Sequence, residues 1–269
     1  MLNGCPVKLK GTNLHQDHAG VGTGIPDRLW EYRIKKMKTI GSNAIRTSHN
    51  PMSPVFLDLC DRLGMLVIEE NRLMGINREH IGLLEHMIKR DRNHPCIMMW
   101  SIGNEEGALE GNERGLRITK SMSEYVHQLD STRLSTQGTA GGRVSLFGVD
   151  VKGYNYLRQN PIDEFHQKHP EWYSPVGSEE TSGCGTRNVY YTDSLRGWMA
   201  PINRTAQDDN HIINPMARGW QFYHDRPWLA GLFYWTGLDY RGAPNPMLYP
   251  ATGSQFGIFV YCGSPKDEA

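Results

Sequence analysis

The chain has 269 residues, with 29 basic and 29 acidic side chains, so its formal net charge is zero. This balance gives no electrostatic reason to expect a nucleic acid or an anionic membrane as partner. A hydrophobic fraction of 38%, with 7 Trp, 12 Tyr and 7 Phe, argues against intrinsic disorder. The length suits one large domain, and α/β barrels often fill about 250 residues as a single unit.

The five cysteines are odd in number and widely spaced, and no CxxC pair occurs. This pattern predicts free thiols and excludes a zinc ribbon or a dense disulfide framework. No apolar run approaches the roughly 20 residues of a membrane helix. The N-terminus also lacks a charged and then apolar secretory signal, so we expect the cytoplasm as the default location and no membrane partner.

Short β-like runs alternate with helical patterns along the whole chain, which is typical of parallel βα folds. Several runs are continuously apolar, as in parallel strands that helices cover. The predicted strands are Val7–Asn13, Ala44–Ser48, Leu66–Glu69, Cys96–Ile102, Leu134–Gln137, Val149–Tyr154, Pro175–Ser178 and Leu229–Trp235.

Amphipathic helices are predicted between the first five strands. The best defined begins at Ser53-Pro54, an N-cap residue followed by proline at the first helical position, and ends at Gly64. The other three have apolar residues at helical spacing, namely Leu29, Tyr32, Met37 and Ile40; Ile81, Leu84 and Ile88; and Met122, Tyr125, Val126 and Leu129.

The fold class is therefore predicted to be α/β. Eight strands with intervening helices fit a single (β/α)8 TIM barrel better than a doubly wound sheet. A dinucleotide-binding sheet would need a glycine-rich phosphate turn after its first strand, and Gly11-Thr12-Asn13 is not one. In a barrel, functional groups gather where the strands end.

Polar and ionisable side chains follow nearly every predicted strand. In chain order they are Asn13, His15 and Asp17; Arg46 and His49; Glu69 and Glu70; Asn104, Glu105 and Glu106; Asn155 and Tyr156; Glu179 and Glu180; and Trp235 and Asp239. The fourth and seventh strands would face each other across the mouth of the barrel. Each ends in carboxylates, and paired carboxylates that flank a cleft are the groups used in glycoside hydrolysis.

The sequence WSIGNEE over Trp100–Glu106 resembles the acid/base motif of glycoside hydrolase family 2, which contains β-galactosidases and β-glucuronidases. Further stretches agree with this family: KGTNLH from Lys10, IRTSHNP from Ile45, GSE from Gly177, WTGLDYRG from Trp235, SQFGI from Ser254 and YCG from Tyr261. The resemblance covers nearly the whole chain, and SHNP and GLDYRG are most similar to β-galactosidases.

This resemblance implies a role for each matching residue. Glu105 resembles the general acid/base, and Glu179 resembles the nucleophile, with Glu180 as its competitor. The other implied site residues bind the sugar or support the carboxylates. Asn104 would hold the 2-hydroxyl, Tyr156 would hydrogen-bond the nucleophile, Arg46 would keep that carboxylate ionised, His15 and His49 would bind hydroxyls or the transition state, Trp235 would lie under the sugar ring, and Asp239 would bind a hydroxyl or support its loop.

The chain departs from the family pattern in three places. The family usually has β-sandwich domains before the barrel, whereas residues 1–269 are expected to form the barrel alone. Ala243 stands where an acidic residue is usual after DYRG. The acidic-plus-histidine metal pattern of some β-galactosidases is missing around Glu69–Arg72, so we expect neither a metal nor another cofactor.

The resemblance implies a retaining exo-β-glycosidase, first of all a β-galactosidase that hydrolyses terminal β-D-galactosides and can also transglycosylate. Its partner would be a β-galactoside or a related oligosaccharide. A β-glucuronidase or β-mannosidase of the same family is the catalytic alternative, and a non-catalytic carbohydrate-binding barrel is the alternative outside catalysis.

Overall fold

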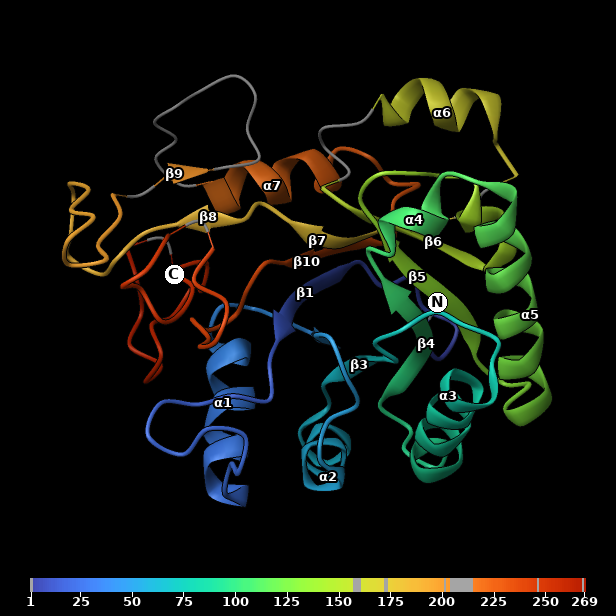
Figure 1. Cartoon of the computed structure of the whole chain (residues 1–269), viewed down its shortest axis with the longest axis horizontal. Coiled ribbons are helices and arrows are strands. Elements are labelled where there is room, and N and C mark those ends of the chain that lie inside the picture. The colour runs from blue at the N-terminus through green and yellow to red at the C-terminus, as the bar shows by residue number, and fades with distance from the viewer. Residues whose placement is uncertain are drawn as a thin grey trace.

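The computed structural model describes residues 2–156, 161–171, 174–200, 202–203, 215–245, 247–267 and 269. Eight parallel strands close into a barrel in the order β1-β10-β7-β6-β5-β4-β3-β2 (Figure 1). The strands are β1 (Leu9–Leu14), β2 (Ala44–Thr47), β3 (Leu66–Glu70), β4 (Ile97–Asn104), β5 (Leu134–Thr139), β6 (Val151–Asn155), β7 (Val176–Glu180) and β10 (Gly231–Tyr234). All eight predicted strands, and the TIM barrel itself, are confirmed.

The interior of the barrel is packed with apolar side chains rather than open. Successive side chains of a strand point to opposite faces, so each strand sends some residues inward and the rest toward the helices. One buried cluster takes one residue from each of seven strands: Leu9, Ala44, Ile68, Met99, Val151, Val176 and Phe233.

Helices cover the outside of the barrel, with α1, α2, α3 and α5 beside β1 to β5 in Figure 1. They are α1 (Asp27–Thr39), α2 (Pro54–Leu63), α3 (Arg78–Asp91) and α5 (Glu113–Leu129). Their apolar faces form the larger core cluster with the strands, including Trp30, Met37, Phe56, Leu84 and Met122. Tyr32, expected on the apolar face of α1, is instead 38% exposed.

Helix α2 begins and ends where the sequence predicts, but only its C-terminal end has the predicted local interactions. Pro54 is its first residue and Ser53 is the N-cap, but the Ser53 side chain makes no capping hydrogen bond. Gly64 ends the helix with a left-handed φ of 64°. This is a conformation that glycine adopts without the steric penalty of a Cβ.

The second half of the barrel is less regular than its first half. Between β5 and β6 lies only a 3₁₀ turn, η1 (Ser145–Gly148), and short helices α4 (Gly107–Glu110) and α6 (Ile162–Lys168) flank the strands. A two-stranded antiparallel sheet, β8 (Gly183–Cys184) with β9 (Ile202–Asn203), and helix α7 (Pro215–His224) come between β7 and β10. The sequence analysis did not predict these elements.

Two further features bear on the sequence-based expectations. Within the described ranges, no helix is long and apolar enough to cross a membrane. The cysteines whose side chains are described, Cys5, Cys60, Cys96 and Cys262, are free thiols.

Candidate active site

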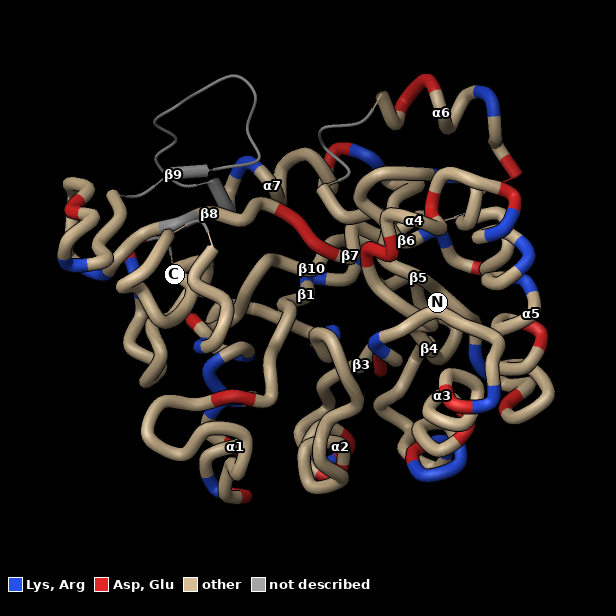
Figure 2. The backbone as a smooth tube through the Cα atoms, viewed as in Figure 1, with Lys and Arg blue, Asp and Glu red and all other residues tan. Residues whose placement is uncertain are grey.

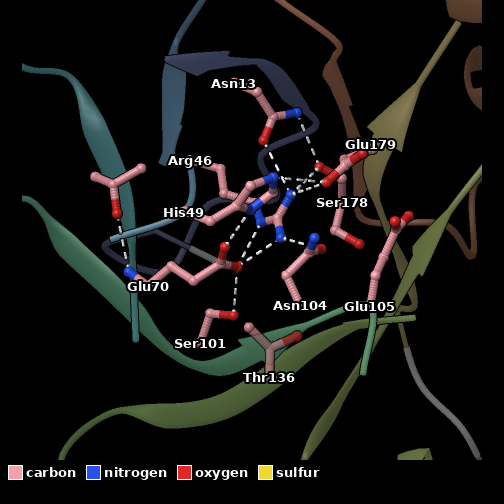
Figure 3. Close-up of polar contacts among 12 residues, drawn as sticks. Asn13, Arg46, His49, Glu70, Ser101, Asn104, Glu105, Thr136, Ser178 and Glu179 are labelled. Carbon is pink, nitrogen blue, oxygen red and sulfur yellow. Dashed lines mark hydrogen bonds and ion pairs between the residues drawn. The ribbon is translucent and has the colours of Figure 1, made fainter. Parts of the chain in front are cut away.

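The two carboxylates predicted to carry the chemistry follow β4 and lie in β7. Glu105 comes directly after Asn104, is exposed, and has a left-handed φ of 50°. Its backbone N–H donates to the carbonyl of Gly138 at 3.0 Å, which fixes this uncommon conformation. Glu179 is 3% exposed. In Figure 3 both side chains lie on the same side of Arg46.

Arg46 of β2 is the centre of the polar network, as Figure 3 shows. It is 1% exposed, and its guanidinium contacts Glu70 on one side and Glu179 on the other, at 2.6 Å and 2.9 Å. Two further bonds run from Arg46 to the side-chain oxygens of Asn13 and Asn104, at 3.0 and 2.7 Å. The planar guanidinium can serve these four side-chain acceptors at once because its donors point outward in fixed directions.

Glu179 therefore has a partner on each of its oxygens. Oε1 accepts from Arg46, and His49 Nε2 lies 3.6 Å from it, while Oε2 accepts from the Tyr156 hydroxyl at 3.0 Å. Burial raises the pKa of Glu179, Arg46 and His49 oppose that rise, and Glu105 adds to it. The net pKa of Glu179 is raised, and Arg46, expected from the sequence to keep this carboxylate ionised, offsets part of the effect of burial.

The adjacent Glu180 points elsewhere. It is fully buried, and its Oε1 accepts from the hydroxyl of Tyr223 on α7 at 3.1 Å. Adjacent residues of a strand face opposite sides, so the direction of Glu179 into the network turns Glu180 outward.

Asn104 is oriented by two donors to its side-chain oxygen. Arg46 and Asn155 Nδ2 both donate to Asn104 Oδ1, the second at 3.0 Å. The amide of Asn155 also donates to Glu105 Oε1 at 2.8 Å. Both donors occupy the oxygen of Asn104, so its side-chain nitrogen is the group left to donate a further hydrogen bond.

Four aromatic rings pack together beside the carboxylates. Trp235 stacks on His49 with ring centroids 5.1 Å apart, and His15 stacks on Tyr240 at 3.8 Å. His15 and Trp235 meet edge to face at 5.0 Å. Burial and the nearby His49, Arg33 and Arg46 lower the pKa of His15 well below its usual value, so His15 is neutral at pH 7.

Asp239 is hydrogen-bonded to the segment near the end of the chain. Its Oδ1 accepts from the backbone N–H of Gly257 and from Lys266 Nζ, both at 2.8 Å. Burial raises the pKa of Asp239 to about 6, although Lys266 opposes this rise. Of the two roles that the sequence left open, these contacts favour loop support.

The structure adds site residues that the sequence analysis did not select, all at strand ends or beside them. Glu70 is fully buried, and it accepts from Arg46, from Ser101 Oγ at 2.8 Å and from His49 Nδ1 at 2.7 Å. Burial alone would raise its pKa, but Arg46, His49 and Ser101 lower the pKa to about 2. Its position after an apolar strand was the available signal, but nothing in the sequence separates it from Glu69.

Gly138 of β5 was also missed. A Cβ at this position would lie 2.6 Å from Asn104 Oδ1 and 2.9 Å from Arg46 Nη2. The close approach of these two side chains therefore requires glycine there. Within the described parts of the chain, no group of three or more His, Cys, Asp or Glu residues is arranged to hold a metal ion.

Comparison with known proteins identifies the family of the chain. The model of "Glycosyl hydrolases family 2, TIM barrel domain" matches residues 1–180. The chain is 32% identical to "Beta-galactosidase BoGH2A" of Bacteroides ovatus over 99% of its own length, and 25% identical to the beta-glucuronidase of Sus scrofa over all of it. It spans only 38% and 43% of these two relatives.

A solved structure gives the same result. The chain superposes on a "glycosyl hydrolase family 2 (GH2) member from Bacteroides cellulosilyticus" with a TM-score of 0.76 and 31% identity, covering 99% of this chain and 32% of that one. With the closed barrel and the family match over residues 1–180, the chain belongs to glycoside hydrolase family 2, as its TIM barrel domain.

Proposed function

We propose that the chain is a retaining exo-β-glycosidase, specifically a β-galactosidase, with residues 1–269 as its catalytic domain. One observation carries the proposal: two carboxylates in different surroundings project from β4 and β7 at one end of the barrel. Glu179 is buried and hydrogen-bonded on both oxygens, whereas Glu105 is exposed. A double displacement needs two carboxyl groups with such different roles.

In the first step Glu179 attacks the anomeric carbon, while Glu105 protonates the departing oxygen. Arg46 and Tyr156 hold the two oxygens of Glu179, so the attacking carboxylate is fixed in direction before the sugar binds. Burial raises the pKa of Tyr156 well above its usual value, so its phenol stays a donor through the reaction.

In the second step Glu105 removes a proton from water, which attacks the glycosyl-enzyme on the face that the leaving group vacated. Asn155 holds one oxygen of Glu105, and the exposure of Glu105 gives water access to it. Asn104 would donate to the 2-hydroxyl, and Trp235, with His15 and His49, would line the sugar site. Another sugar in place of water would give transglycosylation.

The charges around the site favour a neutral sugar. A glucuronide would need a cation or amide for its carboxylate. The nearby Arg46 and Lys266 are each paired with a carboxylate, and Arg72 donates to the backbone carbonyl of Asn104 at 3.0 Å. β-Glucuronidase activity remains the alternative, because the relative from Sus scrofa is named a beta-glucuronidase. A non-catalytic sugar-binding barrel is the second alternative.

A panel of 4-nitrophenyl glycosides tests the proposal on the 269-residue chain. We expect the β-galactoside to give the highest kcat/KM, above the β-glucuronide and β-mannoside, and ¹H NMR to show the β-anomer as the first product. A 2-fluoro-galactoside should label Glu179. A label on Glu180 would overturn the assignment of the nucleophile, and a first product with the α-anomer would overturn retention.

A further inference from the structure

Two adjacent glutamates at the end of β3 hold the segment after β2 from opposite sides. Glu70 faces the barrel mouth and contacts the ring of His49 at 2.7 Å. Glu69 faces the helices, is fully buried, and accepts the backbone N–H of Met52 through Oε1 at 3.0 Å. Met52 is only three residues after His49.

The backbone carbonyl of Met52 is also held by a side chain. Arg90, near the end of α3, donates to it from Nη2 at 2.7 Å. Asp91 fixes that guanidinium with two hydrogen bonds, from Nε at 2.6 Å and from Nη2 at 2.7 Å. We call Glu69, Arg90 and Asp91 the Met52 clamp.

The anchored residue cannot shift without disturbing the core. The side chain of Met52 is 1% exposed and belongs to the main hydrophobic cluster. Next to it, the backbone N–H of Ser53 donates to Gln16 Oε1 at 2.9 Å, and Gln16 adjoins His15. The Met52 clamp therefore holds one end of the segment His49–Met52. The other end carries the His49 ring, which lies beside Glu179.

We propose that Glu69 is a positioning residue for catalysis, which places His49 against Glu179 by anchoring the backbone of Met52. Only Asn50 and Pro51 separate the anchor from His49, so a displacement of Met52 would be transmitted to the ring. The 3.6 Å separation of His49 Nε2 and Glu179 Oε1 would change with it. Displacements of about 1 Å in such groups can cost about 10²-fold in rate.

The chemistry of Glu69 also selects the variants. Burial and the neighbouring Asp91 raise the pKa of Glu69 to about 8, so its carboxyl is mostly neutral at pH 7 and accepts through a carbonyl oxygen. Its Oε2 is buried with no hydrogen-bond partner in the described parts of the chain. Glutamine has the same shape and keeps the acceptor, whereas leucine removes it and keeps the bulk.

The test compares Glu69→Gln and Glu69→Leu in the wild-type and His49→Ala backgrounds. We expect Glu69→Gln to stay within threefold of wild type in kcat/KM for the nitrophenyl galactoside, and Glu69→Leu to fall at least tenfold. In the His49→Ala background, Glu69→Leu should cost less than threefold more, because the group through which it acts is gone. Additive losses would overturn the proposal.

Two further variants separate positioning from general stability. Asp130→Leu removes another buried carboxylate, whose partners include Trp100 and Arg133. The fall in kcat/KM that it causes should add fully to the fall caused by His49→Ala. Arg90→Lys keeps the charge beside Asp91, but one ammonium cannot replace a guanidinium bonded to both Asp91 and Met52. It should show the same non-additivity with His49→Ala if Glu69→Leu fails to fold.

The activity readout rests on the proposed function, so a second measurement is independent of it. Hydrogen exchange of the Met52 amide should speed up at least tenfold in Glu69→Leu and stay within threefold of wild type in Glu69→Gln and Asp130→Leu. Unchanged exchange in Glu69→Leu would overturn the clamp. A wild-type chain inactive on every glycoside would instead refute the proposed function, and exchange would still decide the anchoring of Met52.

Discussion

Arg46 shares one positive charge between two buried carboxylates that respond to it differently. Glu70 has Arg46, His49 and Ser101 as partners, and its pKa falls to about 2, so it remains an anion at any working pH. Glu179 has a net raised pKa, since burial outweighs its contacts. In the proposed double displacement, the Glu70 anion would hold the guanidinium of Arg46 in place while the Glu179 carboxylate loses its charge in bond formation.

Replacement of Glu105 tests the acid/base role at this scale. In Glu105→Ala, a substrate with a poor leaving group should lose about 10²–10⁴-fold in glycosylation, whereas dinitrophenyl galactoside, whose leaving group needs no proton, should lose far less. Azide needs no base, so it should restore turnover and give the β-galactosyl azide, measured by NMR. Equal losses on both substrates without azide rescue would contradict the role.

Gly138 gives a second test at the scale of single residues. Gly138→Ala places a methyl group within 3 Å of both Asn104 Oδ1 and Arg46 Nη2, so these groups must separate. We expect kcat/KM to fall by about 10²-fold, in line with the cost of misplaced catalytic groups. The control is Gly82→Ala on α3, where a Cβ meets no atom within 4 Å. Equal activity in both variants would refute the steric requirement.

At the scale of elements, the ends of β3 and β7 each place two neighbouring glutamates on opposite faces of the barrel wall. In β3 and β7, one glutamate of a pair enters the polar network and its neighbour turns to the helices, Glu70 against Glu69 and Glu179 against Glu180. Strand geometry imposes this division. The helices then complete it, since α3 supplies Arg90 and α7 supplies Tyr223.

The caps of α2 and α3 differ in a way that stability can measure. Asn77 caps α3 through a bond from the His80 N–H to its side chain at 2.9 Å, whereas Ser53 makes no such bond and its Oγ is buried without a partner in the described residues. Asn77→Ala should cost about 1 kcal/mol of unfolding free energy and Ser53→Ala less than about half of that. Urea unfolding of both variants checks this order.

The packing of β3 against α2 and α3 should make the stability of the protein depend on pH through Glu69. Asp91 and Arg90 on α3 and Cys60 on α2 surround it, and its pKa of about 8 lies above the ordinary 4.5. The folded state therefore holds a proton that the unfolded state releases, so stability falls as pH rises from about 4.5 to about 8. The slope is at most about 1.4 kcal/mol per pH unit.

The side chain in Glu69→Gln does not titrate, so this variant should not lose the stability that wild type loses between about pH 4.5 and 8. Its advantage over wild type in urea unfolding should widen from pH 5 to pH 8. Parallel stability curves for the two proteins would contradict a raised pKa at Glu69.

At the scale of the whole molecule, the chain after β10 is tied to the barrel by charge as well as by packing. Charged residues lie mostly on the outer helices in Figure 2, but β7 carries its carboxylates among the strands. Lys266, near the end of the chain, donates to Asp239 and to the carbonyl of Gln255 at 2.7 Å. Phe256 of the same segment packs with Trp235 and Tyr240.

Lys266→Met should leave a buried carboxylate without its cation, a change that typically costs 3–5 kcal/mol. The pKa of Asp239, about 6 with Lys266 present, should rise further without it. Because the pKa of Asp239 in the folded state lies above its ordinary 3.8, stability falls as the pH rises from about 3.8 to the folded-state pKa. Lys266→Met should therefore lose more unfolding free energy at pH 8 than at pH 5. Asp239→Asn combined with Lys266→Met should recover most of the loss, and urea unfolding at both pH values measures it.

The regular part of the molecule could be predicted because its determinants are local. Apolar runs of strand length, Pro54 and Gly64 around α2, and the spacing of apolar residues in α3 and α5 depend on neighbours within a few residues. The 3₁₀ turn η1 escaped prediction because its four residues are too few to show a periodic pattern. The β8–β9 pair escaped it because the pairing joins residues about twenty positions apart, Gly183 with Asn203.

The candidate site divides in the same way. The sequence by itself determined the eight strands, the family, and the two candidate carboxylates Glu105 and Glu179, because motif and strand order suffice for these. Only the tertiary structure decided that Glu70 and not Glu69 joins Arg46, that Gly138 must lack a side chain, and that Asp239 pairs with Lys266. These are contacts between strands and loops far apart in the chain, and closure of the barrel brings them together.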